Sequence, residues 1–247
     1  MKKFTLKKRG NITFLSYPPL EEIPWLIQGT SLKIETKRRD DPALLSFLEA
    51  LEIRTVPLIT LKQVHSSRII TIKGDPENFK GISGDGLITD LPKVAIGVFT
   101  ADCVPLILVA KKRRAIGVIH AGWRGTIGGI ARKAVREMIK EYDILPEEVV
   151  ALMGPAISAK CYEVGEEVMK AFRECFPEGE GIISSHKGRY FIDLSRANKY
   201  QLIREGIRED NIILTELCTF ISSLKLPSYR REGKKAGRML TLAMIRG

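Results

Sequence analysis

Two histidines and one cysteine in this chain carry the side chains of a zinc site. The chain has three histidines in all, and two of them, His65 and His120, flank Cys103 in its apolar, glycine-rich middle third. Each of the three follows a segment that is typical of a strand: QVH at 63–65, TADC at 100–103 and IHAGWRG at 119–125. Two imidazoles and a thiolate suit zinc, and three protein ligands leave one coordination position for water or substrate. If the three side chains meet, the sequence predicts a metalloenzyme.

The segment around His120 also favours anion binding. An apolar strand at 115–119 leads to His120, and we expect a helix from Thr126, a good N-cap residue, to about Tyr142. Free N–H groups at a helix N-terminus bind anions, and the neighbouring glycines allow a close approach to the backbone. Arg124 adds a cation that binds oxyanions through two hydrogen bonds. The alternative is an ordinary strand–turn–helix unit in which His120 caps the turn.

Cys103 has a carboxylate beside it, that of Asp102. Asp102 can act as a general acid or base, or it can orient a ligand imidazole. Adjacent side chains of an extended chain point to opposite sides, so both residues reach one site only if the backbone turns there. The alternative is that Cys103 is an inert core residue.

Two further polar residues are candidates near His65. Gln63 lies two positions before His65, hence on the same face of a strand, and its amide can bind a substrate amide or the edge of a base. Asp85, in the segment SGDGLIT, either forms an Asx turn or directs a carboxylate at the site.

Composition excludes several classes of protein. The net charge of +11 favours anionic partners, but the 40 lysines and arginines are spread along the whole chain, so nucleic-acid binding is not expected. The run at 111–114 is typical of a solvated hairpin turn. No apolar stretch is long enough to span a membrane, and no secretory signal is evident, so we expect a cytoplasmic protein with no membrane partner. The cysteines other than Cys103 have no CxxC spacing and are interpreted as small apolar residues rather than disulfides.

The periodicity of apolar residues predicts an α+β fold in one domain over residues 1–247. Residues 1–40 are typical of strands at an antiparallel edge, and a Gly/Asp-rich loop is expected at 81–86. Helices are expected at 42–52, 126–142, 163–176 and 194–205. Strands are expected near 56–64, 68–73, 94–100, 104–110, 115–120, 148–153, 189–193, 211–215 and 239–245.

Six motifs together resemble a known family. They are QVHS at 63–66, GDGLITD at 84–90, TADCVPL at 100–106, HAGWRGT at 120–126, GPAISAKCYEVG at 154–165 and SYRREG at 228–233. In this order they resemble the bacterial YfiH and human laccase-domain-containing family, also called the multicopper polyphenol oxidase or purine nucleoside phosphorylase family. The resemblance spans nearly the whole chain and implies a four-layer α/β/β/α sandwich with mixed β-sheets. It also implies one zinc ion held by His65, Cys103 and His120. Leu226 and Pro227 stand where the family usually has an aromatic pair.

The resemblance further implies an activity on purine nucleosides. Family members are described as cleaving adenosine, inosine and methylthioadenosine with phosphate, and as deaminating adenosine in a second reaction. Arg124, Arg230 and Arg231 are the candidates for binding phosphate through paired hydrogen bonds. Tyr162 is the candidate for stacking on a purine. A solvated charged turn at 230–231 and a core role for Tyr162 are the alternatives.

Three other readings stay open. A copper-dependent polyphenol oxidase of the laccase type needs more imidazoles than three histidines supply, although one His–Cys–His set can form a blue-copper centre with a weak axial ligand such as Met153. A hydrolase of a cell-wall precursor is suggested because some relatives are named peptidoglycan editing factors. A Cys–His hydrolase would use Cys103 as its nucleophile, which a thiolate committed to zinc cannot be. The sequence makes no prediction of the oligomeric state.

Overall fold

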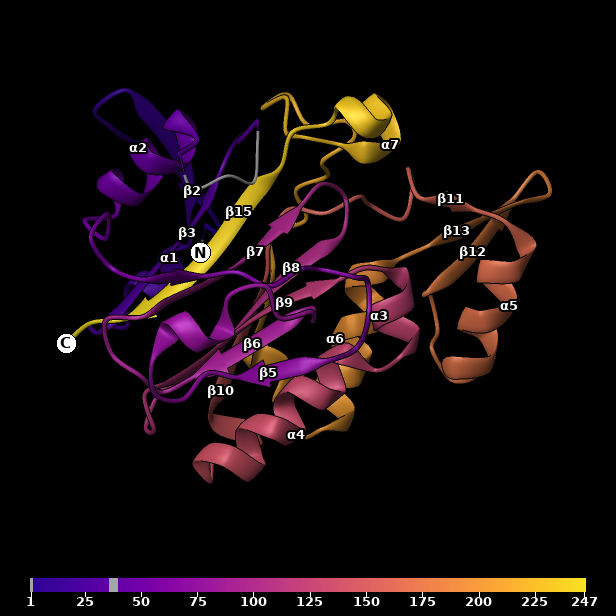
Figure 1. The fold of residues 1–247 in the computed structure, drawn as a ribbon. Coiled ribbons are helices and arrows are strands. Elements are labelled where there is room, and N and C mark those ends of the chain that lie inside the picture. Colours follow the sequence, from indigo (N-terminus) through magenta and orange to yellow (C-terminus); the bar gives the residue numbers. More distant parts are fainter. Residues whose placement is uncertain (1, 36–39) are drawn as a thin grey trace.

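Two six-stranded mixed sheets lie face to face in the computed structural model, which describes residues 2–35 and 40–247 (Figure 1). The first sheet has, in spatial order, β1 (Thr5–Arg9), β2 (Ile12–Ser16), β3 (Leu26–Ser31), β15 (Met239–Ile245), β7 (Ala95–Thr100) and β4 (Leu58–Ile59). The second has β14 (Ile212–Leu214), β10 (Val149–Met153), β8 (Val104–Ala110), β9 (Ala115–Ala121), β6 (Gly86–Thr89) and β5 (Ile69–Thr71). Most neighbours are antiparallel, and the pairs β4–β7, β5–β6 and β10–β14 are parallel.

The central strands are apolar throughout because both of their faces are covered. In β8, Ile107 and Val109 join the core between the two sheets, whereas Leu106 and Leu108 join the core on the opposite face. This alternation follows the two-residue period of a strand. The second sheet is therefore buried on both sides.

Helices cover the two outer faces (Figure 1). On the first sheet, α2 (Pro42–Ala50) packs Leu44 and Phe47 against Phe14, with the two phenyl centroids 5.7 Å apart. On the second sheet lie α4 (Ile130–Tyr142) and α6 (Leu194–Arg204). The layers are thus helix, sheet, sheet and helix, which confirms the predicted α+β sandwich with mixed sheets.

A smaller antiparallel sheet stands beside the sandwich at the end of α6 (Figure 1). It contains β11 (Glu163–Val164), β13 (Arg189–Ile192) and β12 (Ile183–His186), with α5 (Glu166–Cys175) packed on it. The predicted helix at 163–176 was wrong at its start, because residues 163–164 pair with β13 and Gly165 caps the helix. The strand β12 was not predicted.

The helix predicted from Thr126 to Tyr142 is two helices. A short helix, α3 (Trp123–Ile127), begins after Gly122 and ends at Gly128, and Gly129 then caps α4 with a positive φ of 75°. Glycine adopts this left-handed conformation without a steric cost, so the pair of glycines turns the chain. Thr126 is therefore buried inside α3 rather than at an N-cap, and its hydroxyl accepts a hydrogen bond from Asn198.

Several strand predictions were wrong in extent. Of residues 56–64 only β4 is a strand, and of 68–73 only β5. The predicted loop at 81–86 was wrong at Gly86, which is the first residue of β6. The strand β6, which pairs with β9, was not predicted. Short elements that were not predicted are α1 (Pro18–Glu21), α7 (Tyr229–Glu232), η1 (Pro76–Phe79), η2 (Pro146–Glu148), η3 (Glu209–Asn211) and η4 (Gly233–Lys235).

The strands at the edge of the first sheet are those predicted for the N-terminal residues. Strands β1, β2 and β3 are antiparallel neighbours, as expected for residues 1–40, of which 1 and 36–39 lie outside the described residues. The charged run at 111–114 forms the turn of the β8–β9 hairpin, as predicted. Among the described residues, no helix combines the length and apolar character that crossing a membrane requires.

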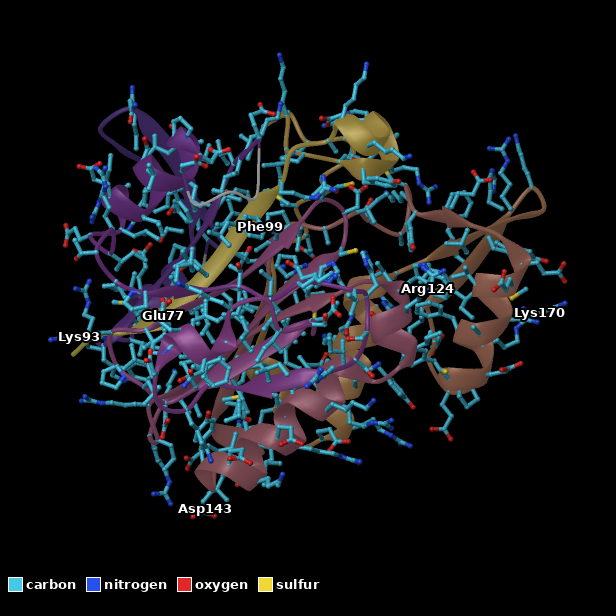
Figure 2. All side chains as sticks on the ribbon, in the orientation of Figure 1. Glu77, Lys93, Phe99, Arg124, Asp143 and Lys170 are labelled. Atoms are coloured by element: carbon cyan, nitrogen blue, oxygen red, sulfur yellow. The ribbon has the colours of Figure 1, made fainter. Side chains whose placement is uncertain are left out.

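Charged side chains project on several sides of the molecule (Figure 2). Lys93, Asp143 and Lys170, for example, extend from widely separated edges. Many surface cations pair with acidic neighbours, as in the ion pairs Arg136–Glu205 and Lys170–Glu166. The positive net charge is therefore distributed over the surface, as the sequence indicated.

Candidate metal centre

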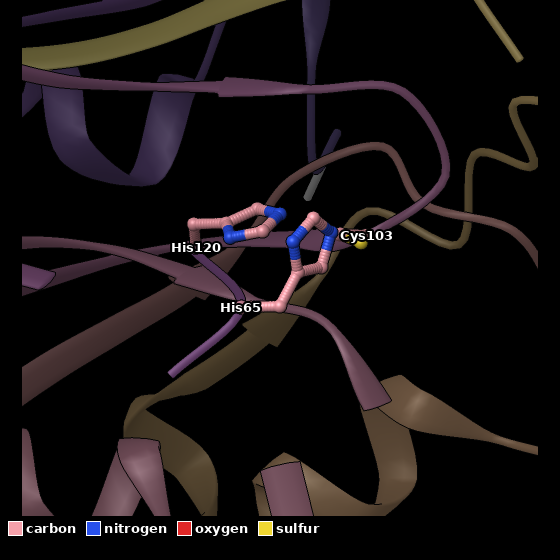
Figure 3. Close-up of side chains that lie close together, drawn as sticks. All are labelled: His65, Cys103 and His120. Atoms are coloured by element: carbon pink, nitrogen blue, oxygen red, sulfur yellow. The ribbon is translucent and has the colours of Figure 1, made fainter. Parts of the chain in front are cut away.

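His65, Cys103 and His120 meet at one end of the sandwich. Their side chains point toward one another (Figure 3), and their potential ligand atoms all lie within 4.8 Å of one another. The two imidazole rings are almost perpendicular, with centroids 4.9 Å apart. His120 is buried, Cys103 half-buried and His65 exposed. Such a spacing allows one metal ion to bind all three, with its open side toward solvent.

The register of the β8–β9 hairpin explains why Cys103 and His120 meet. Pro105 pairs with His120 and Val104 with Ala121, so Cys103 lies across from Gly122, just beyond the ladder. A Cβ atom on Gly122 would lie 3.0 Å from the Cys103 sulfur and 3.1 Å from the His65 ring. Glycine at this position therefore leaves the room that the three side chains occupy.

Asp85 fixes the orientation of the His120 ring. Its Oδ1 lies 2.9 Å from His120 Nδ1, and its own backbone carbonyl accepts the His120 N–H. With Nδ1 bonded to a carboxylate, Nε2 is the nitrogen that remains to ligate a metal. Burial raises the pKa of Asp85, but bonds from His120 and Ser66 outweigh burial and lower it to about 2. Since this lies below its ordinary value of 3.8, the charged form stabilises the fold near neutral pH, and that stabilisation is lost as the pH falls toward 2.

The same carboxylate shapes the loop that carries His65. Asp85 accepts hydrogen bonds from the backbone N–H groups of Val64, His65 and Ser66 and from the Ser66 hydroxyl. His65 has a positive φ of 58°, which is uncommon for a residue with a side chain. His65 was predicted to end a strand, but it lies in a tight loop that Asp85 holds. Asp85 is therefore the functional residue whose role the sequence left undecided.

The backbone also turns at Asp102, as a shared site with Cys103 requires. Asp102 has a φ of 90° and is buried. Its two carboxylate oxygens accept hydrogen bonds from the Thr219 hydroxyl and the Arg230 N–H, each 2.6 Å long. Asp102 thus ties the β7–β8 turn to the segment that leads to α7, and no motif near Asp102 predicts these distant partners.

The charges of Cys103 and His120 depend on each other. Burial raises the pKa of the Cys103 thiol, but His120 and His65 outweigh burial and lower it to about 6. Burial lowers the pKa of His120, but Cys103 and Asp85 outweigh burial and raise it to about 9. The pair therefore favours a thiolate beside an imidazolium at neutral pH. A metal ion that binds there replaces the imidazolium proton as the partner of the thiolate.

A cavity of about 660 Å³ opens above the three candidate ligands. Its lining includes the predicted metal ligands and the predicted catalytic and substrate-binding residues except Arg231, and it does not include the candidate Asp85. It adds the aromatic residues Phe99, Trp123 and Tyr229. The apolar Val64 and Tyr229 at its rim are both about half exposed. A volume of this size is typical of sites for small molecules.

Three arginines line the cavity: Arg124, Arg230 and Arg238. The Arg124 guanidinium lies over the Trp123 ring, 4.2 Å from its centroid, and that of Arg230 lies over Tyr162 at 5.3 Å. Stacking of this kind holds a guanidinium in a defined place while its N–H groups stay available. The sequence interpretation missed Arg238, because no motif joins it to the other residues.

Two predicted residues have structural partners. The Arg231 guanidinium donates to the backbone carbonyls of Thr219, Phe220 and Leu226 and lies outside the cavity lining. The Gln63 amide lines the cavity, but its nitrogen donates to the Phe99 carbonyl and its oxygen accepts the Phe99 N–H. Both side chains thus hold neighbouring backbone in place.

The first prediction concerns the space that Gly122 leaves. We expect Gly122→Ala to weaken metal binding by roughly tenfold or more, the size of effect found when groups around a metal are disturbed. The methyl group must displace the Cys103 sulfur or the His65 ring. The affinity is measured by competition with a chromogenic chelator.

Gly165→Ala is the matched control. Gly165 also precedes a helix, with φ −73° and ψ 167° against −78° and 172° for Gly122, but nothing lies within 4 Å of its added Cβ. An equal loss of affinity in both variants would contradict the steric explanation.

The second prediction concerns the Asp85 charge. Asp85→Asn keeps the shape of the side chain but turns an amide NH₂ toward N–H groups, so the His65 loop and the His120 ring both lose their anchor. We expect metal affinity to fall about 10–100-fold. Asp75→Asn, at the exposed cap of η1, serves as the control with the same chemical change. Unchanged metal affinity in Asp85→Asn would refute this assignment.

Known proteins resemble this chain in sequence and in fold. The chain is 41% identical over 163 residues to a purine nucleoside phosphorylase of Bacteroides thetaiotaomicron, which covers 65% of this chain and 60% of that protein. It is 34% identical over 211 residues to the adenosine deaminase RL5 of an unknown prokaryotic organism, covering 81% and 79%. The crystal structure of YlmD from Geobacillus stearothermophilus superposes with a TM-score of 0.88 at 27% identity, over the full length of both chains.

The model of one protein family matches almost the entire chain. It is described as "Multi-copper polyphenol oxidoreductase laccase", and its match covers residues 31–246. This range contains all three candidate metal ligands and every residue of the cavity lining. The chain therefore belongs to the multi-copper polyphenol oxidoreductase laccase family, which confirms the resemblance seen in its motifs.

Proposed function

We propose that this protein is a zinc-dependent purine nucleoside phosphorylase that also deaminates adenosine. The observation that carries the proposal is that two imidazoles and a thiol, a set suited to one metal ion, line a cavity that three arginines also line. The relatives named purine nucleoside phosphorylase and adenosine deaminase support both reactions. We propose that the substrates are small nucleosides and phosphate, handled by one domain in the cytoplasm.

We propose that His65, Cys103 and His120 hold the zinc ion. Two imidazoles and a thiolate fit zinc, and the open side of the set faces the cavity. When bound, zinc supplies a Lewis acid that polarises a ligand oxygen or nitrogen and lowers the pKa of water. Copper fits less well, because Met153, the axial ligand considered from the sequence, lies in the core between the second sheet and its helices, outside the cavity lining.

In the proposed phosphorolysis, a phosphate oxygen attacks C1′ of the ribose, and the purine leaves with the electrons of the broken bond. Arg124, Arg230 and Arg238 supply the cations that place the phosphate. Arg231 donates to backbone carbonyls and lies outside the cavity lining, so Arg238 takes its place among the candidates. Arg238 lines the cavity, and its Nη1 atom also donates to the Ala236 and Gly237 carbonyls. The arginines also reduce the repulsion between phosphate and the developing negative charge on the purine.

Aromatic residues provide the surface for the purine. Tyr162 lines the cavity, and burial raises its pKa to about 12, so its ring is neutral at all ordinary pH values. Trp123 and Tyr229 lie in the same lining. We propose that a purine stacks on one of these rings, and that Gln63 contributes only through the position of Phe99.

Asp102 is our candidate for proton transfer. Among the described residues of the cavity lining it is the one carboxylate. In phosphorolysis it would deliver a proton to the leaving purine, and in deamination it would move protons between the attacking water and the departing ammonia. Its bonds to Thr219 and Arg230 hold the carboxyl group in place.

A Cys–His hydrolase is the second candidate, because Cys103 and His120 form a thiolate–imidazolium pair. Metal content separates the two readings, since a thiolate bound to zinc is not a free nucleophile.

The third prediction tests the reaction. Adenosine with phosphate should give adenine and ribose 1-phosphate, and adenosine without phosphate should give only inosine and ammonia; both are followed by chromatography. We expect about one zinc ion per chain in protein prepared without added copper. Cys103→Ser should lose the zinc and both activities while keeping its circular dichroism spectrum.

Cys175→Ser, which changes an exposed thiol on α5, is the control and should behave like the wild type. Stoichiometric copper, or full activity in Cys103→Ser, would contradict the proposal. Hydrolysis that needs Cys103 but no metal would favour the Cys–His hydrolase.

The fourth prediction separates proton transfer at Asp102 from a purely positional role. Asp102→Asn can still accept from the Arg230 N–H through its oxygen and donate to the Thr219 hydroxyl through its nitrogen. If Asp102 transfers a proton, kcat falls about 10²–10⁴-fold and one limb of the pH–rate profile disappears. Asp193→Asn, a change at the cap of α6, is the control. A variant with nearly normal kcat and an unchanged profile would assign Asp102 to positioning.

A further inference from the structure

Cys161 and Cys218 lie near the turn that contains Asp102. Cys161 precedes β11 and Cys218 follows β14, and Ser158 contacts both of them, because its carbonyl accepts the Cys161 N–H at 2.9 Å and its N–H donates to the Cys218 sulfur at 3.4 Å. The two segments are joined by backbone pairing, since Ala156 forms a parallel bridge with Cys218 and accepts the Thr219 N–H at 3.1 Å. Backbone pairing therefore brings the two cysteines to the same place in the fold.

The surroundings of Cys218 favour its thiolate. The Ser158 N–H donates to the Cys218 sulfur at 3.4 Å, and the N–H groups of Phe220 and Ile221 are also directed at it. Burial raises the pKa of Cys218, but the Ser158 side chain and these N–H groups outweigh burial and lower it. For Cys161, burial and the neighbouring Cys218 raise the pKa. Cys218 is thus the nucleophile of the pair, and Cys161 is the thiol that keeps its proton.

A small oxidant can reach this pair without passing the metal centre. A surface hollow of about 520 Å³ lies between the ends of β10 and β14 and the helix α6, and Cys218 is part of its lining. Cys103 lines the metal cavity and not this hollow. Although Cys218 is only 8% exposed, its thiol borders a space that admits a molecule the size of hydrogen peroxide.

We propose that Cys161 and Cys218 are a redox modification site, a dithiol that hydrogen peroxide converts reversibly to a disulfide. The Cys218 thiolate attacks one peroxide oxygen, the O–O bond breaks, and the products are a sulfenic acid and water once a proton is added. The Cys161 sulfur then attacks the Cys218 sulfur, the S–O bond breaks, and the hydroxyl leaves with the Cys161 proton as a second water. Peroxide is reduced, the two thiols are oxidised, and an external thiol reverses the reaction.

The position of the pair connects it to the cavity. Cys161 precedes Tyr162, whose ring lies under the Arg230 guanidinium. Cys218 precedes Thr219, whose hydroxyl holds the Asp102 carboxylate, and the Asp102 carbonyl accepts the Ile157 N–H at 2.9 Å. A disulfide between the thiols would therefore shift both the segment that carries Tyr162 and the segment that carries Thr219. In a consequence that rests on the proposed function, the disulfide form binds nucleoside and phosphate with a changed KM.

The fifth prediction is tested by peptide mass spectrometry. The metal-loaded protein is treated with hydrogen peroxide, remaining thiols are blocked with iodoacetamide, and the protein is digested without reduction. We expect a cross-linked peptide pair containing Cys161 and Cys218, its disappearance after dithiothreitol, and unchanged metal content. Cys218 should be lost faster than the exposed Cys175, because hydrogen-bond donors around its sulfur favour the thiolate.

Two variants test the order of the steps. Cys161→Ser should stop at a sulfenic acid on Cys218, which a 1,3-diketone reagent labels. Cys218→Ser should leave Cys161 unmodified at the same peroxide concentration. Cys175→Ser is the matched control and should cross-link like the wild type.

Overoxidation of Cys218 without a cross-link, a cross-link that includes Cys103, or equal modification of Cys161 in Cys218→Ser would each overturn the proposal. A second measurement compares KM of the reduced and oxidised forms. Because the cross-link is detected by mass, a protein that cross-links but lacks nucleoside activity refutes only the proposed function. A protein that is active but does not cross-link refutes only the switch.

Discussion

The arrangement at the end of the sandwich depends on one buried carboxylate, that of Asp85. A buried charge is costly unless hydrogen bonds satisfy it, and here three backbone N–H groups, one hydroxyl and one imidazole do so. These donors come from two segments that are not neighbours in the sequence, the loop at 64–66 and the end of β9. Because both segments donate hydrogen bonds to the same carboxylate, they lie close together. Each segment carries one of the two imidazoles.

The sheet supplies the third ligand by a different principle. Regular antiparallel pairing of β8 with β9 sets Cys103 across from Gly122 through the register of the backbone. The left-handed conformation of Asp102 then turns the chain at the start of β8, so the thiol faces the cavity. One ligand, His120, thus lies in a strand, Cys103 directly precedes one, and His65 lies in a loop. The ligand on the loop is also the exposed one.

Local patterns in the sequence were enough to predict the elements whose structure depends mainly on neighbouring residues. The apolar stripe of α4, the solvated turn at 111–114 and the rarity of histidine and cysteine each point to what the structure contains. Long-range contacts decide the rest. Nothing near Asp102 indicates Thr219, and nothing near Arg238 indicates the cavity. The helix start was misplaced because Thr126 has the properties of a cap, whereas the Gly128–Gly129 turn and the bond from Asn198 bury it.

Cys103 and Cys218 both have lowered pKa values, but their surroundings direct the two thiolates to different chemistry. Cys103 owes its lowered pKa to two imidazoles, which are themselves metal ligands, so the conditions that create this thiolate also favour its capture by a metal. Cys218 owes its lowered pKa to the Ser158 side chain and to backbone N–H groups rather than to metal-binding imidazoles, and its neighbour is a second thiol. The first thiolate is therefore directed to coordination and the second to nucleophilic attack. This difference in partners, rather than a difference in exposure, makes the two sites chemically distinct.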